Sequence, residues 1–216
     1  HSERVAPASS LRPMAEQAMD FARHLGLEDT RIDLELPRDA AAERWAAEWT
    51  TAHGSAPVLL NLGATKPANR WPAANWGRLA QRVTAELGRT VVLTGGGNDR
   101  EIAAKVRAGG GERSIDLVGS TDLLQLIALQ RRAALVISCD SGPMHTAAAV
   151  GAPLLALFGA ADERRTGPYA QGRHVLRTHP PCSPCGKRSC PLPRHVCMEE
   201  LDVATVFDAV QRRLPS

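Results

Sequence analysis

The sequence predicts an α/β protein with a doubly wound, Rossmann-like parallel sheet, and three observations support this fold class. From residue 57 onward, short apolar segments alternate with helical ones, as in successive β-α-β units. The apolar segments are continuous, as expected for strands that helices cover on both faces. Gly and small polar residues follow the segments, at the edge where such sheets bind ligands.

The expected elements divide the chain at residue 57. Strands are predicted at residues 58–61, 90–94, 114–118, 134–138 and 153–158, and helices at about 72–87, 98–108, 122–131, 143–150 and 201–213. Right-handed crossovers between parallel strands then give the Rossmann-like domain, 57–216. Residues 1–56 are expected to be a helical connecting segment, with an amphipathic helix near 11–25 and a second helix near 37–51.

Composition narrows the function classes. The chain has 216 residues, a net charge of +3 and only 4% aromatic residues, which fits an anionic small ligand better than nucleic acid. No apolar run is long enough to cross a bilayer, and no signal peptide is visible. We therefore expect a cytoplasmic protein that does not bind nucleic acid. The absence of an initiator Met suggests a fragment or a processed chain.

The segment Asp140 to His145 is the sharpest candidate site. Gly142 allows close approach of a ligand to the backbone, and the free N–H groups of the helix that follows form an anion site suited to a diphosphate. Asp140 and Ser141 then contact the ligand, cap the helix, or both. The simpler alternative is a helix capped by Asp140 that needs no ligand.

Two other strand ends carry candidate ligand residues. Thr65, Lys66 and Arg70 lie in a Pro-containing loop, where a cation would neutralise phosphate charge; the alternative is a solvated loop anchored by Trp71. Gly95, Gly96 and Gly97 do not form the GxGxxG pattern of NAD sites. We interpret them as a turn from which Asn98 or Asp99 could hydrogen-bond a ribose.

Four of the five cysteines cluster in one loop. Cys182, Cys185, Cys190 and Cys197 have the spacing C-x2-C-x4-C-x6-C. Four thiolates could close a structural site for zinc, or for iron, although the spacing is not that of a common zinc ribbon. Free thiols and disulfides are the alternatives. A four-cysteine site leaves no open position, so we expect no catalytic metal.

Several of these segments together resemble glycosyltransferase family 9, which contains the ADP-heptose:lipopolysaccharide heptosyltransferases. The resemblance covers roughly residues 55–213. It is carried by the Lys66 to Pro72 run, by 92–96, by 117–123, and above all by Asp140-Ser141-Gly142-Pro143-Met144-His145-Thr146-Ala147-Ala148-Ala149, which is similar to the family's DTGPxHxAAA signature.

The resemblance implies the C-terminal, donor-binding half of a GT-B architecture. Asp140, Ser141 and Gly142 would then contact the heptose and diphosphate, His145 would flank them, and Lys66 or Arg70 would neutralise the diphosphate as it leaves. The acceptor and the catalytic base, an Asp, would belong to an N-terminal domain that this sequence does not contain. Asn69 stands where the family usually has a basic residue.

The implied reaction is inverting transfer of heptose from ADP-heptose, or from a related nucleotide sugar, to a lipopolysaccharide core acceptor, without a catalytic cofactor. Peripheral contact with the cytoplasmic face of the inner membrane is left open. One alternative is a protein heptosyltransferase of the autotransporter type. Others are a nucleotide-binding domain that is not a transferase, and an interaction module built on the cysteine loop.

Overall fold

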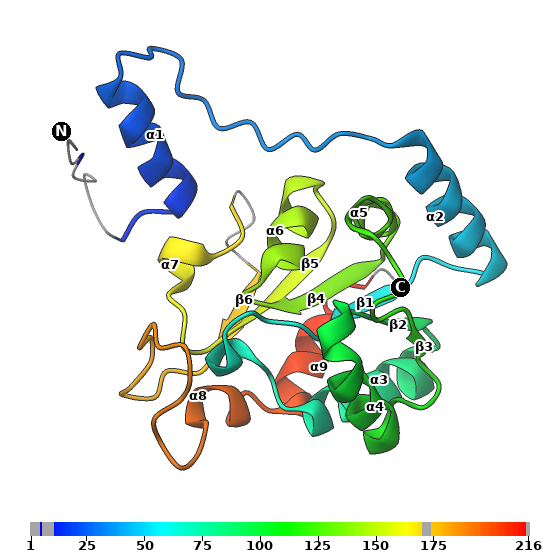
Figure 1. The fold of residues 1–216 in the computed structure, drawn as a ribbon. Coiled ribbons are helices and arrows are strands. Elements are labelled where there is room, and N and C mark those ends of the chain that lie inside the picture. The colour runs from blue at the N-terminus through cyan, green and yellow to red at the C-terminus, as the bar shows by residue number, and fades with distance from the viewer. Residues whose placement is uncertain (1–4, 6–10, 170–173, 215–216) are drawn as a thin grey trace.

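A parallel sheet forms the centre of the computed structural model, which describes residues 5, 11–169 and 174–214 (Figure 1). The strands are β1 (Val58–Asn61), β2 (Val91–Thr94), β3 (Ile115–Asp116), β4 (Leu135–Cys139), β5 (Leu154–Phe158) and β6 (Val175–Arg177). Their order is β3-β2-β1-β4-β5-β6, and every pairing is parallel. This order confirms the doubly wound fold.

The described residues form nine α-helices, most of which pack against one face of the sheet or the other. They are α1 (Met14–His24), α2 (Ala40–Ala52), α3 (Ala73–Leu87), α4 (Arg100–Val106), α5 (Leu123–Arg131), α6 (Gly142–Ala149), α7 (Glu163–Thr166), α8 (Val196–Glu199) and α9 (Val203–Gln211). Short 3₁₀ turns follow β1 and β2, at η1 (Pro67–Asn69) and η2 (Gly97–Asp99), and a π-type turn, η3 (Arg107–Gly111), extends α4. The sequence did not predict β6, α7 or α8, which are only three or four residues long.

Alternate side chains of each strand enter two separate cores, because successive residues point to opposite faces. In β1, Val58 and Leu60 pack with α3, α4 and α9, whereas Leu59 packs on the opposite face with α5 and α6. All four residues of β1 are buried. Burial on both faces explains why these segments read as unbroken apolar runs.

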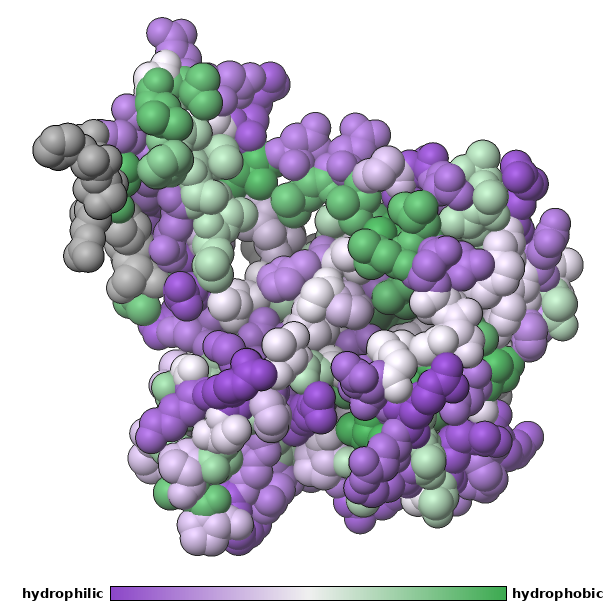
Figure 2. All heavy atoms as spheres, in the orientation of Figure 1, coloured by the Kyte–Doolittle hydropathy of each residue, from purple (hydrophilic) through white to green (hydrophobic). Residues whose placement is uncertain are grey.

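The segment before β1 has two parts that pack differently. Helix α2 is capped by Asp39 and buries Ala42 and Ala46 against α5, so it joins the helical layer of the sheet. Helix α1 buries none of its residues, and an extended stretch joins it to α2 across the top of Figure 1. Figure 2 shows apolar residues on the surface of α1. Met14 and Phe21 of this helix are exposed.

The sheet order places a crevice beside β1. The chain runs outward from β1 to β3 on one side and from β4 to β6 on the other, so the two loops that leave β1 and β4 diverge to opposite faces. Asn61 and Ser138 are directly paired near the ends of these strands. No helix among the described residues is long and apolar enough to cross a membrane.

Candidate functional site

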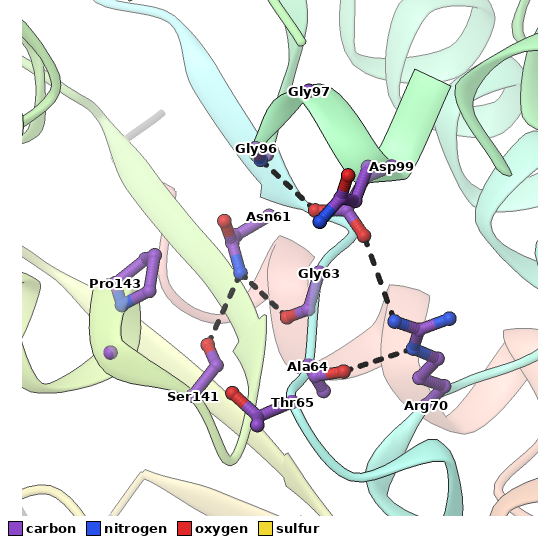
Figure 3. Close-up of a pocket in the computed structure, with 13 residues that line it drawn as sticks. Asn61, Gly63, Ala64, Thr65, Arg70, Gly96, Gly97, Asp99, Ser141 and Pro143 are labelled. Carbon is purple, nitrogen blue, oxygen red and sulfur yellow. Dashed lines mark hydrogen bonds and ion pairs between the residues drawn. The ribbon is translucent and has the colours of Figure 1, made fainter. Parts of the chain in front are cut away.

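A pocket of about 490 Å³ opens at this point of divergence (Figure 3). Its walls come from the loops after β1 and β2 and from the start of α6. It is lined by Asn61, Gly63, Ala64, Thr65, Arg70, Gly95, Gly96, Gly97, Asn98, Asp99, Ser141, Gly142 and Pro143. Segments about 80 residues apart in the sequence therefore form one cavity at the edge where ligands bind in sheets of this class.

Asp99 joins two walls of the pocket. Its Oδ2 accepts a hydrogen bond from the Gly96 backbone N–H at 2.9 Å and lies so close to Gly63 that a Cβ there would be 2.4 Å away. Arg70 donates from Nε to the Ala64 carbonyl at 3.0 Å, and its Nη2 lies 3.9 Å from Asp99 Oδ1. The guanidinium is thus held at the pocket wall while 42% of the Arg70 side chain remains exposed.

Asn61 connects β1 to the loop that begins α6. Its Nδ2 lies 3.1 Å from the Gly63 carbonyl oxygen and 3.2 Å from each of the hydroxyl oxygens of Ser138 and Ser141, so its two hydrogens are shared among three acceptors. The Gly63 carbonyl can only accept, which fixes the nitrogen on that side. Figure 3 shows the amide nitrogen facing Gly63 and Ser141, with Oδ1 on the other side. The buried Oδ1 has no hydrogen-bond partner among the described residues.

Helix α6 begins without a side-chain cap. Ser141 occupies the N-cap position with extended backbone angles, and its hydroxyl makes no capping hydrogen bond. The alternative in which Asp140 caps the helix is therefore wrong, because Asp140 precedes the N-cap and is bound by Asn69 instead. A Cβ built on Gly142 meets no atom within 4 Å. Pro143 has no N–H, and the Met144 N–H donates to the Ser141 carbonyl at 3.1 Å, so the start of α6 leaves the Gly142 N–H beside open space.

Asp140 lies among charged groups next to the pocket. Burial raises its pKa, while the charges of His145 and Lys66 and hydrogen bonds with Thr166 and Asn69 lower it. Asn69 Nδ2 donates to Asp140 Oδ2 at 2.9 Å. This carboxylate is therefore held by groups from the β1 loop, α6 and α7, all at one edge of the sheet.

His145 lies on the wall of a second cavity. This space of about 470 Å³ is bordered by α1, by residues 33–36, by α6 and by the α7 region. His145, Thr146 and Thr166 contribute polar groups to it, and Met14, Leu34 and Leu36 contribute apolar ones. The two cavities therefore flank α6.

The structure gathers most of the predicted site residues in the first pocket: Thr65, Arg70, Gly95, Gly96, Asn98, Asp99, Ser141 and Gly142. Lys66, Asp140 and His145 form the adjacent charged group. Sequence reasoning missed Asn61, Asn69 and Ser138 as site residues. Asn61 carried a usable signal, since it is a polar residue that ends an apolar strand at the ligand edge.

The four clustered cysteines line a small cavity of about 180 Å³, together with Ala68 and His195. All are free thiols; Cys197 is buried, and Cys182 and Cys185 are exposed. Burial, and then the three neighbouring thiols, raise the pKa of Cys197 to about 11. The described residues contain no group of three or more His, Cys, Asp or Glu side chains arranged to hold a metal ion, so a structural metal stays a prediction.

The loop that carries these cysteines is tied to the strand ends. Gly186 donates from its N–H to the Ala160 carbonyl at 2.7 Å, and the Ser183 hydroxyl donates to the Gly159 carbonyl at 2.6 Å. The fifth cysteine, Cys139, is fully buried, and this burial raises its pKa to about 12. Its thiol therefore stays protonated and unreactive at neutral pH.

Known proteins are similar to this chain in sequence and in fold. The lipopolysaccharide heptosyltransferase 1 of Pseudomonas aeruginosa is 30% identical over 181 residues, which is 83% of this chain but 47% of that protein. The chain thus spans about half the length of this curated relative. The crystal structure of a family 9 glycosyl transferase from Veillonella parvula matches 97% of this chain and 61% of its own, with a TM-score of 0.79 at 24% identity.

A more distant structure is that of TibC, an iron-containing dodecameric heptosyltransferase from enterotoxigenic E. coli, in complex with ADP-D-β-D-heptose. It covers 90% of this chain and 52% of its own, with a TM-score of 0.61 at 16% identity, which shows a shared fold alone. The model of glycosyltransferase family 9 (heptosyltransferase) matches residues 2–195. This chain therefore belongs to glycosyltransferase family 9.

Proposed function

We propose that this chain is the donor-binding part of a heptosyltransferase that moves heptose from ADP-heptose to a lipopolysaccharide core acceptor with inversion of the anomeric centre. The observation that carries the proposal is the pocket at the divergence of β1 and β4, where Arg70, a glycine-rich turn and the uncapped start of α6 meet. Family membership supports the reaction class.

The proposed chemistry needs stabilisation of a leaving diphosphate. As the acceptor oxygen attacks the anomeric carbon, the bond from that carbon to the diphosphate breaks and negative charge grows on ADP. The Gly142 N–H at the positive end of the α6 dipole and the guanidinium of Arg70 would stabilise this charge, with Lys66 nearby. Asp140 would hold the sugar through its hydroxyl groups. The base that takes the acceptor proton would come from a separate acceptor-binding domain.

The domain division at residue 57 is part of this proposal. Residues 1–56 would connect the acceptor-binding domain to the sheet domain, and the exposed apolar face of α1 supports that view. A cytoplasmic location with peripheral contact at the inner membrane belongs to the same proposal.

Calorimetric titration of ADP-heptose, ADP and NAD into the chain tests the donor site. We expect ADP-heptose and ADP to bind and NAD not to bind. Arg70→Ala should weaken ADP by about 1–3 kcal/mol, because a charged hydrogen bond to phosphate is lost. Arg82→Ala is the matched control, since Arg82 pairs with Glu86 on the surface of α3. Preferential binding of NAD would support a nucleotide-binding domain that is not a transferase.

We also propose that Cys182, Cys185, Cys190 and Cys197 hold a structural zinc or iron ion. The convergence of all four on one cavity, and the effect of three of them on the pKa of the fourth, support this. Such an ion would fasten the loop without taking part in transfer. Elemental analysis of the purified chain should find about one metal ion per chain, and none in a Cys185→Ser/Cys190→Ser variant. Absence of metal from the unaltered chain would overturn this proposal.

A further inference from the structure

The cysteine loop holds Ala68 by both of its backbone polar groups. The Ala68 N–H donates to the Arg188 carbonyl at 3.1 Å, and the Ala68 carbonyl lies 2.9 Å from His195 Nε2. Because a carbonyl only accepts, His195 must donate from Nε2. Ala68 is 1% exposed and also borders the cavity of the four thiols. The position of this residue is therefore set by a loop more than 110 residues away in the sequence.

The next residue, Asn69, is bound to Asp140. Asn69 is 3% exposed and belongs to the same short 3₁₀ turn, Pro67–Asn69. Its Nδ2 reaches Asp140 Oδ2, while its own Oδ1 is buried without a hydrogen-bond partner among the described residues. An unsatisfied buried carbonyl destabilises a fold, so packing does not explain an asparagine here. The hydrogen bond to Asp140 does.

The pKa of Asp140 is raised by burial, and its polar and charged partners act against that rise. Asp140 is half-buried, which favours its neutral form, and the groups that oppose this are His145 on α6, Lys66 in the β1 loop, Thr166 on α7 and Asn69. Of these, Asn69 is the one whose backbone neighbour is fixed by the cysteine loop. A short path of contacts thus leads from His195 through Ala68 and Asn69 to Asp140.

We propose that Asn69 is a positioning residue for Asp140, and that the Cys182–Cys197 loop holds Asn69 in place through His195 and Ala68. The inference rests on the proposed function, in which Asp140 contacts the donor sugar. It gives the cysteine loop a part in donor recognition even though no cysteine lies in the donor pocket. It also assigns a role to the amide that stands where a basic residue is usual in the family.

The first test is a double-mutant cycle read by calorimetric titration of ADP-heptose. Asn69→Ala should weaken binding by about fivefold or more, as should Asp140→Ala. If Asn69 acts through Asp140, adding Asn69→Ala to Asp140→Ala should cause no further loss. Losses that simply add would overturn the inference. The pH dependence gives a second reading: in Asn69→Ala, binding should fail at a higher pH on acidification, because a bond that favours the charged carboxylate is gone.

The second test addresses the loop. His195→Ala should weaken ADP-heptose binding in the unaltered chain but not in Asn69→Ala. Arg188→Ala is the matched control, because Arg188 contributes only its backbone carbonyl, and it should bind as the unaltered chain does. Equal losses in both variants, or persistence of the His195→Ala effect without Asn69, would overturn the inference. Thermal melts show whether each variant folds. If His195→Ala does not fold, His195→Asn is used in its place.

These outcomes separate the inference from the function on which it rests. If the unaltered chain binds neither ADP-heptose nor ADP, the proposed function fails and the inference fails with it. If the unaltered chain binds ADP-heptose and Asn69→Ala binds it equally well at every pH, the inference fails alone.

Discussion

The side-chain amide of Asn61, at the end of β1, donates a hydrogen bond to the hydroxyl of Ser141, at the start of α6, over 3.2 Å and 80 residues of sequence. The same amide group reaches the Gly63 carbonyl. One buried amide therefore joins the two loops that diverge from the middle of the sheet, and its nitrogen is the atom that does so.

Replacing this amide by a carboxyl group tests that role. In Asn61→Asp, a carboxylate would face the Gly63 carbonyl, with no hydrogen to donate at neutral pH. We expect a loss of about 1–3 kcal/mol in the free energy of unfolding at pH 7. Burial should raise the pKa of the new carboxyl above its unfolded value of about 3.9, so the loss should be small below that pH and grow as pH rises. Urea unfolding at several pH values measures this, and a loss independent of pH would contradict it.

Gly63 is the second test position. A Cβ at Gly63 would lie 2.4 Å from Asp99 Oδ2, so Gly63→Ala should displace Asp99 and lower both the melting temperature and the affinity for ADP. Gly96→Ala is the matched control for the melting temperature, because its Cβ would be 3.8 Å from the same oxygen. Adding Asp99→Ala to Gly63→Ala should restore part of the lost stability. Equal melting temperatures for Gly63→Ala and Gly96→Ala would show that Gly63 does not lie against the Asp99 carboxylate.

Two buried tryptophans form a matched pair. Trp71 and Trp76 contact each other edge to face, but of their two indole N–H groups only that of Trp71 has a hydrogen-bond partner among the described residues, the Leu201 carbonyl at 2.8 Å. Trp71→Phe should therefore destabilise the chain by about 1 kcal/mol more than Trp76→Phe, because it leaves that carbonyl without its donor. Denaturant unfolding compares the two. Equal losses would show that packing alone decides both positions.

Arg131 fastens the segment that precedes the sheet domain. It donates to Glu43 on α2 at 2.6 Å and to the Leu36 carbonyl at 3.0 Å, and its side chain is 11% exposed. In Arg131→Ala we expect faster amide hydrogen exchange over residues 34–43, since these contacts hold the stretch against α5. Arg132→Ala, at the next position, should leave exchange there unchanged. The same exchange rate in both variants would mean that apolar packing holds the segment.

The sequence could predict the strands because each is buried on both faces and therefore reads as an unbroken apolar run. It could not predict β6, since Val175–Arg177 is too short to show a period and its residues are only partly buried. The ligand edge was also predictable, because Gly and polar residues follow the strands. The hydrogen bonds from Asn61 to Ser138 and Ser141 and from Asn69 to Asp140 were not, since each joins residues more than 70 positions apart.

The contacts that complete the pocket also constrain the order in which it can appear during synthesis. A nascent chain that has emerged as far as α4 exposes both glycine-bearing loops, yet Ser138, Asp140 and Ser141 have not left the exit tunnel. The hydrogen bond of the Trp71 indole forms later still, because its acceptor, the Leu201 carbonyl, lies 130 residues downstream. Contacts of such long range form late, after the cost of closing large loops has been met. The pocket is thus a late product of folding, and under the proposed function a ribosome-bound chain should acquire nucleotide affinity only once α9 has left the exit tunnel.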